Sequence, residues 1–197
     1  MTPRVPMVSD FLDYAVDAAQ RSTLYWDTLR QRGNEYLRHE MAGKPPLLRF
    51  EHELLLDARD FAEHPCNYAL LRILPRPGDA PTDPDKRPFV VVDPRAGHGP
   101  GIGGFKEDSE VGNALILGHP VYFVTFFPEP VPGQRLLDIM RAEARFLELV
   151  RDRHPKAPGG PCVIGNCQAG WAIMGLAAIR PDLPGPILVA GSPLSYW

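Results

Sequence analysis

Apolar residues along the chain follow two spacings, and together these predict the order of the secondary-structure elements. Between residues 9 and 40 they recur at loosely helical spacing, which predicts one or two amphipathic helices. Short apolar runs then alternate with helical patterns, as expected for β-strands joined by helices. The expected strands are residues 47–56, 67–74, 89–93, 121–127, 161–165 and 187–190, and the expected later helices are residues 108–117, 134–154 and 168–180.

Two of the strand segments are continuous apolar runs, FVVVD at residues 89–93 and VYFVTFF at residues 121–127. Such runs are typical of strands buried on both faces. Alternating strands and helices favour a parallel sheet covered on both sides, and right-handed crossovers favour a doubly wound arrangement. We therefore predict an α/β fold with a doubly wound, mainly parallel sheet. We divide the chain into an N-terminal helical lead-in, residues 1–60, and a partial core, residues 61–197.

The composition excludes several classes of protein. The 197 residues are 44% hydrophobic and 23% charged, which is ordinary for a folded domain. The formal net charge of -3, without a large basic cluster, argues against nucleic-acid binding. No apolar run approaches the ~20 residues of a transmembrane helix. Acidic residues at positions 10, 13 and 17 interrupt the region where a signal peptide would be apolar, so we expect a cytoplasmic protein.

The three cysteines, Cys66, Cys162 and Cys167, do not form a recognisable framework. Their odd number, without a secretory leader, argues against structural disulfides. Their spacing also lacks the paired pattern of a structural zinc site. We therefore expect no metal and no resident cofactor, and any functional cysteine should act as a single thiol.

Cys167 lies where an expected strand turns directly into an expected helix, in the sequence VIGNCQAGWA. A nucleophile elbow requires this order, with small residues two positions before and after the nucleophile. Gly165 and Ala169 satisfy that requirement, and Gly170 follows them. The N-terminus of a helix also favours the thiolate, which is the reactive form of cysteine. We predict that Cys167 is a nucleophile, with the alternative that such a turn accepts cysteine for its small size alone.

The glycine-rich loop after residues 89–93 is expected beside this turn, because both segments follow strands of a parallel sheet. The N–H of Gln168 would form one half of an oxyanion hole. We favour Ala96 for the second half, because Pro94 has no N–H. The rest of the expected active-site loop consists of Arg95, Gly97, His98 and Gly99. His98 could act as a base or order the loop, and Arg95 could bind an anionic substrate group or form a surface salt bridge.

From residue 89 onward the chain resembles polyhydroxyalkanoate synthases, and more closely a bacterial family of 3-hydroxyalkanoate synthetase-like proteins. The matching stretches are VVDPRAGHGPGIGGFKEDSEVG, GHPVYFVTFFPEPVPGQ, VIGNCQAGWA and GPILVAGSPLSYW. The elbow of the synthases reads G-x-C-x-G-G, which residues 165–170 match except at Ala169.

This resemblance implies an α/β-hydrolase-like core in which Cys167 accepts a 3-hydroxyacyl group from a coenzyme A thioester. The hydroxyl group of an acceptor then attacks, which extends the polyester. A histidine activates both the cysteine and this hydroxyl group, and an aspartate supports the process. The implied partners are therefore a small acyl thioester or a polyester, and the implied location includes the surface of a polyester granule.

The acid and base that usually follow the nucleophile in this fold are not evident. The 30 residues after Cys167 contain Asp182 as their only acid and no histidine. Three explanations stay open: a fragment truncated after the elbow, a naturally short and catalytically incomplete relative, or service by an upstream histidine such as His98. We expect the isolated chain to be slow or inactive, and its open sheet edge to favour homo-oligomers.

Two other functions stay open at this point. One is a cysteine-dependent hydrolase of the thioesterase or dienelactone hydrolase type. The other is a non-catalytic module whose N-terminal helices bind a partner or a granule surface.

Overall fold

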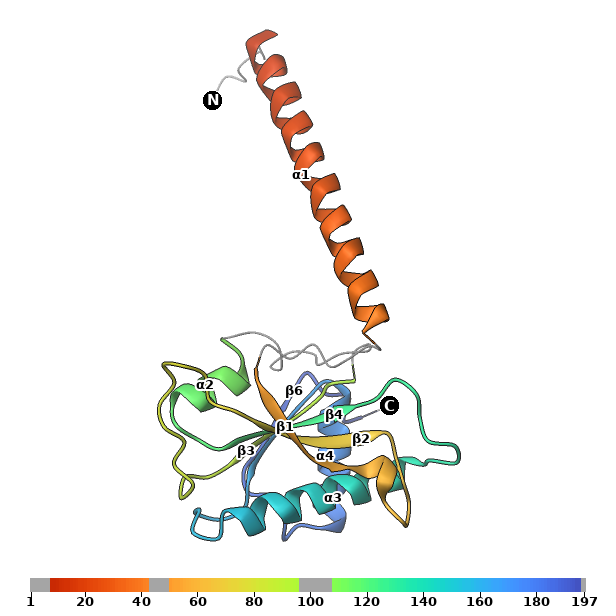
Figure 1. The fold of residues 1–197 in the computed structure, drawn as a ribbon, viewed down its shortest axis with the longest axis vertical. Helices are drawn as coiled ribbons and strands as arrows, with labels where there is room; N and C mark the ends of the chain where they lie inside the picture. Colours follow the sequence, from red (N-terminus) through yellow and green to blue (C-terminus); the bar gives the residue numbers. More distant parts are fainter. Residues whose placement is uncertain (1–7, 43–49, 96–107, 196–197) are drawn as a thin grey trace. The chain divides into compact units, whose positions relative to one another are not determined.

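A computed structural model describes residues 8–42, 50–95 and 108–195 (Figure 1). The chain divides into two compact units, Met1–Pro45 and Pro46–Trp197. The elements are α1 (Val8–Met41), β1 (His52–Asp57), a short 3-10 helix η1 (Ala58–Asp60), β2 (Tyr68–Ile73), β3 (Phe89–Val92), α2 (Glu110–Ile116), β4 (Val121–Phe126), α3 (Leu136–Arg153), β5 (Cys162–Asn166), α4 (Gln168–Ile179) and β6 (Ile187–Ala190). The second unit therefore includes β1, which lies within the stretch that the sequence pattern assigned to the helical lead-in.

In the described residues of the first unit there is one helix of 34 residues, α1, which is one of the two alternatives (one or two helices) that the spacing left open. Ion pairs join neighbouring turns along it, between Asp17 and Arg21 at 2.8 Å and between Asp27 and Arg30 at 2.7 Å. Pairs three and four residues apart stabilise a helix modestly. Across the described ranges, no helix combines the length and the apolar character that crossing a bilayer requires.

Among the residues that the structure describes, the second unit is built on a six-stranded sheet in the order β1-β2-β4-β3-β5-β6. Strand β2 runs antiparallel to its neighbours β1 and β4, whereas the pairs β3–β4, β3–β5 and β5–β6 are parallel. The prediction of a mainly parallel sheet is confirmed. The strand order, the single reversed strand and the turn into a helix after β5 together give an α/β-hydrolase-like core.

Helices cover both faces of this sheet because alternate residues of the central strands point to opposite sides. Val90 and Val92 of β3 belong to a buried cluster that includes Phe146 of α3 and residues of α4. Val91, between them, belongs to a second cluster with Val111 of α2. Helices α3 and α4 thus pack on one face and α2 on the other (Figure 1).

Local sequence explains where two of these helices begin. The hydroxyl of Ser109 accepts a hydrogen bond from the N–H of Gly112 at 3.3 Å, which caps α2. The carboxylate of Asp138 accepts one from the N–H of Arg135 at 3.0 Å at the start of α3. Cys167 is the N-cap residue directly before α4, and its side chain makes no capping hydrogen bond. The start of α4 is therefore defined by the turn at Cys167.

Candidate functional site

The turn between β5 and α4 has the geometry of a nucleophile elbow. Cys167 has φ 51° and ψ -127°, a conformation that is rare for residues other than glycine and is typical of strained functional positions. Its N–H donates to the carbonyl oxygen of Ala190 on β6 at 2.9 Å, which anchors the turn to the sheet. The residue is exposed. The sulfur therefore lies at an accessible, conformationally constrained position.

Close packing explains why the residues around Cys167 are small. A Cβ atom on Gly165 would lie 2.9 Å from the Cα of Gly170. A Cβ atom on Gly170 would lie 2.6 Å from the Cβ of Ser192 and 2.7 Å from a methyl carbon of Val189, and it would also meet the hydroxyl oxygen of Ser192. The hydroxyl of Ser192 donates to the carbonyl oxygen of Gly165 at 3.4 Å. Ser192, which the sequence pattern did not indicate, therefore supports the elbow from the end of β6.

Asn166 connects the elbow to the opposite face of the sheet. It is buried, and its side-chain amide donates to the carboxylate of Glu110 at 3.1 Å. Glu110 is the first residue of α2. The residue before Cys167 is thus fixed by a side chain more than fifty positions earlier in the chain.

Gln168 lies at the first position of α4, where the N–H groups of a helix have no partner within the helix. This is the position that the predicted oxyanion hole requires of it. Ala96, Gly97, His98 and Gly99 lie outside the described residues. The second half of the oxyanion hole and the role of His98 therefore stay predictions.

The elbow lies at a topological switch point of the sheet. Strands β3 and β5 are parallel neighbours, with Val92 paired with Gly165. The segments that follow the two strands therefore leave the sheet next to each other. After β3 the chain continues to α2 on one face, and after β5 it continues to α4 on the other. Connections that diverge in this way leave a crevice at the carboxyl ends of the strands, where ligands of open α/β sheets bind.

Arg95 occupies this edge of the sheet, but its side chain is only 12% exposed. Its guanidinium lies 3.4 Å from the carboxylate of Glu143 on α3. The backbone N–H of Arg95 donates to the carboxylate of Asp93 at 2.8 Å. Of the two alternatives for Arg95, the structure shows an ion pair, but a buried one rather than one on the surface, because the guanidinium pairs with the buried Glu143. Binding of an anionic substrate group by Arg95 stays a prediction.

Burial strongly affects both carboxyl groups. It raises the pKa of Asp93 to about 7 and that of Glu143 to about 7, and the charge of Arg95 opposes the rise in each case. Within the described residues, one oxygen of each carboxylate and the Nε of Arg95 have no hydrogen-bond partner. One cation thus faces two buried acids. Glu143 could have been noticed in the sequence, because it shares the helical spacing of the buried residues Ile139, Phe146 and Val150.

The three cysteines lie in different environments. Cys66 is buried, and burial raises the pKa of its thiol to about 11. Cys162 is half-buried within β5, and burial raises the pKa of its thiol as well. Cys167 is exposed. Only its position combines access with a turn at the carboxyl end of a central strand.

A family model matches residues 17–197, which is most of the chain. The chain belongs to the family described as "Protein of unknown function (DUF3141)". A curated relative from Rhizobium meliloti, "Uncharacterized protein in ackA 5'region", is 60% identical over 195 residues. The match covers 99% of this chain and 26% of the relative, so the DUF3141 chain spans about a quarter of that protein's length.

Three solved structures of hydrolytic enzymes are similar to part of this chain. An α/β hydrolase from a Medee basin deep-sea metagenome library is 14% identical, with a TM-score of 0.45, and the match covers 73% of this chain and 57% of that one. A hydrolase from a Rhodococcus strain is 14% identical, with a TM-score of 0.42 and coverages of 72% and 47%. An esterase of M. tuberculosis is 22% identical, with a TM-score of 0.38 and coverages of 77% and 43%. The α/β-hydrolase-like description of the DUF3141 chain rests on its own strand order and elbow.

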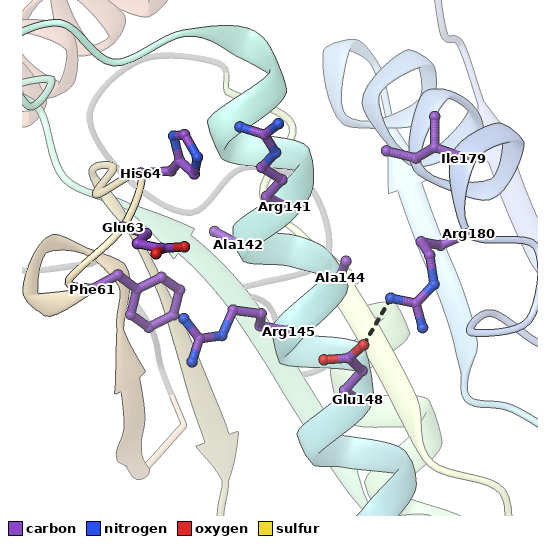
Figure 2. A pocket seen from close by; sticks show the side chains of 10 residues that line it. All are labelled: Phe61, Glu63, His64, Arg141, Ala142, Ala144, Arg145, Glu148, Ile179 and Arg180. Carbon is purple, nitrogen blue, oxygen red and sulfur yellow. Dashed lines mark hydrogen bonds and ion pairs between the residues drawn. The ribbon is translucent and has the colours of Figure 1, made fainter.

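A pocket of about 450 Å³ lies over α3, between the segment after η1 and the end of α4 (Figure 2). Its lining residues are Phe61, Glu63, His64, Arg141, Ala142, Ala144, Arg145, Glu148, Ile179 and Arg180. Arg180 and Glu148 form an ion pair across it at 2.8 Å. None of these lining residues belongs to the elbow, and those from α4 and just after it, Ile179 and Arg180, lie at the other end of that 12-residue helix, which is roughly 18 Å long. The pocket is therefore a feature distinct from the elbow.

No base is paired with Cys167 in the part of the chain that the structure describes. No hydrogen bond joins a histidine to it there, and His154 instead contacts the hydroxyl of Tyr122 at 2.7 Å. Within the same ranges, no group of three or more His, Cys, Asp and Glu side chains is arranged to hold a metal ion.

We expect Gly170→Ala to destabilise the DUF3141 chain by about 1–3 kcal/mol, because the added methyl group must displace Ser192 and Val189. Urea unfolding measures the change. Gly33→Ala is the matched control, because nothing lies within 4 Å of a Cβ atom there. A Gly170→Ala protein that unfolds at the wild-type urea concentration would show that the elbow is not tightly packed.

We expect the stability of the protein to fall as the pH rises from about 5 to 8, in part through Glu143. Its pKa is near 7 when folded and 4.5 ordinarily, so the folded chain retains a proton that the unfolded chain releases in this range. Glu143→Gln removes this ionisation and should make the decline shallower in urea unfolding at several pH values. Glu63→Gln, at an exposed position, serves as the control. Equal declines in wild-type and Glu143→Gln proteins would contradict the assignment.

Proposed function

We propose that this chain carries the nucleophile of an acyl-transfer site and that Cys167 forms an acyl-cysteine intermediate. The observation that supports this most directly is the exposed thiol at a positive-φ turn between β5 and α4. A cysteine placed for packing alone would be buried, as Cys66 is. The switch point between β3 and β5 adds the crevice in which an acyl donor could lie.

The proposed step is exchange of one thioester for another. The Cys167 thiolate attacks the carbonyl carbon of the donor, and a carbon–sulfur bond forms as the carbonyl becomes an oxyanion. The N–H of Gln168, at the start of α4, donates to this oxyanion. The oxyanion then collapses, the bond to the donor sulfur breaks, and the departing thiolate takes a proton from solvent. The product keeps the reactivity of a thioester, so a second nucleophile can accept the acyl group.

The resemblance to polyhydroxyalkanoate synthases favours a 3-hydroxyacyl coenzyme A thioester as the donor and a hydroxyl group as the acceptor. Transfer to water instead would make the same intermediate part of a thioesterase. The two reactions share Cys167 and Gln168 and differ only in the acceptor. We assign the base that activates the acceptor to no residue of the described ranges.

Cys167 should react with iodoacetamide far faster than the other two cysteines at neutral pH. Burial blocks Cys66, and a thiol pKa two units above the ordinary 9.0 alone reduces its thiolate fraction about 100-fold. Peptide mass spectrometry at several reaction times gives the three rates in one sample. Repeating the reaction in concentrated urea controls for the reagent, since the three rates should then converge. Labelling of Cys167 no faster than that of Cys162 in the folded protein would remove the basis for an accessible nucleophile.

Incubation with 3-hydroxybutyryl coenzyme A should add one hydroxybutyryl group to Cys167, with slow release of free coenzyme A. Intact-mass spectrometry detects the adduct, and a thiol reagent follows the release. Cys167→Ala should abolish both, whereas Cys162→Ser, at the start of the strand that leads to Cys167, should leave both unchanged. A Cys167 that reacts with iodoacetamide but accepts no acyl group would rule out the proposed function. Release of coenzyme A and free acid over many turnovers would identify hydrolysis.

A further inference from the structure

Arg95 is an unusual residue to find at the end of a central strand. It follows β3 closely and has φ 59°, in the left-handed region that favours glycine. The hydrogen bond from its N–H to Asp93 supports this conformation. Its side chain is nearly buried, and a guanidinium is buried only where other groups compensate for lost hydration.

The compensation comes from three other elements of the fold. Glu143 on α3 supplies a carboxylate at 3.4 Å. The guanidinium also lies 5.1 Å from the ring centroid of Tyr68 on β2 and 5.4 Å from that of Trp171 on α4. Both distances fall within the range of a cation–π interaction. The side chain of Arg95 thus connects the end of β3 to β2, α3 and α4.

The contact with Trp171 reaches the elbow directly. Trp171 lies four residues after Cys167, so the two residues are one helical turn apart at the start of α4. No side chain caps that end of the helix. The first turn of α4 is instead restrained by its contacts with neighbouring elements. One of these contacts is with Arg95, which follows β3, the strand that pairs with β5.

We propose that Arg95 is a positioning residue for Cys167. Its backbone N–H donates to Asp93, and its planar guanidinium pairs with Glu143 and packs against Trp171. The side chain thereby sets the first turn of α4 relative to the end of β3. This inference rests on the proposed role of Cys167 as a nucleophile. The contact between Arg95 and Trp171 can nevertheless be tested without any reaction at Cys167.

The test uses Arg95→Lys, which keeps the positive charge but removes the flat guanidinium that packs against the ring. The chain has three tryptophans, so Trp26→Phe and Trp197→Phe leave Trp171 as the only reporter. In this background Arg95→Lys should shift the emission of Trp171 to longer wavelength and reduce its protection from acrylamide. Arg59→Lys is the matched control. Arg59 also pairs with a carboxylate, at 2.6 Å, and lies over an aromatic ring, that of Phe127, at 3.5 Å.

The second measurement, with the native tryptophans restored, is the rate at which iodoacetamide alkylates Cys167. Arg95→Lys should lower it about tenfold, because a displaced first turn of α4 weakens the helix N-terminus that favours the reactive thiolate. Trp171→Leu should lower it similarly while leaving the buried charges paired. The double variant should be no slower than either single variant, because both remove the same contact. Arg59→Lys should leave the rate unchanged.

The outcomes separate the inference from the proposed function. Unchanged Trp171 fluorescence in Arg95→Lys, or additive effects of the two substitutions on the alkylation rate, would overturn the inference. A changed fluorescence with an unchanged alkylation rate would also overturn it, since Arg95 would then only stabilise the fold. If Arg95→Lys does not fold, Trp171→Leu decides alone: a wild-type rate overturns the inference and a slower rate supports it. A failure of acyl transfer to wild-type Cys167 would instead count against the proposed function.

Discussion

The parallel pairing of β3 with β5 is the constraint on which the candidate site depends. With Val92 opposite Gly165, the chain leaves the sheet from two neighbouring strands at the same level. The following helices then pack on opposite faces, because α2 and α4 belong to different core clusters. A shift of one residue in this pairing would exchange the side chains that face the two clusters. The buried valines of β3 therefore fix both the sheet and the place where the two connections diverge.

Buried polar groups, which are unfavourable in a protein core, concentrate at the carboxyl ends of β3 and β5, called here the carboxyl edge of the sheet. Asp93, Glu143 and Asn166 are each at most 5% exposed, and each lies at the edge or contacts a residue there. Burying a carboxylate in an otherwise apolar core is unfavourable unless charge or hydrogen bonds compensate, and here one guanidinium compensates for two acids. Perturbed carboxyl groups of this kind are common at functional sites. The strained backbone at Arg95 and at Cys167 lies in the same region, which supports a functional role for this edge of the sheet.

The elements that follow one another closely in the chain were predictable, because local spacing defines them. The runs at residues 89–93 and 121–127 became β3 and β4, and the turn from strand to helix at Cys167 lies where small residues surround it. The reversed direction of β2 was not evident, because nothing within residues 67–74 indicates which way a strand runs relative to its neighbours. The place of Arg95 in the loop after residues 89–93 was expected, but its burial was not, because a lone arginine in a glycine-rich loop looks exposed until its distant partners are known.

The sequence by itself determined the alternation of strands and helices, the buried character of the central strands and the small residues that permit a tight turn at Cys167. These are properties of neighbouring residues, and they follow from periodicity and side-chain size. The tertiary structure decided which groups surround that turn. Glu110 contacts Asn166, Ser192 contacts Gly165, and Glu143 holds the Arg95 side chain that packs on Trp171. Glu110, Ser192 and Glu143 come from three separate segments, so these contacts depend on long-range packing.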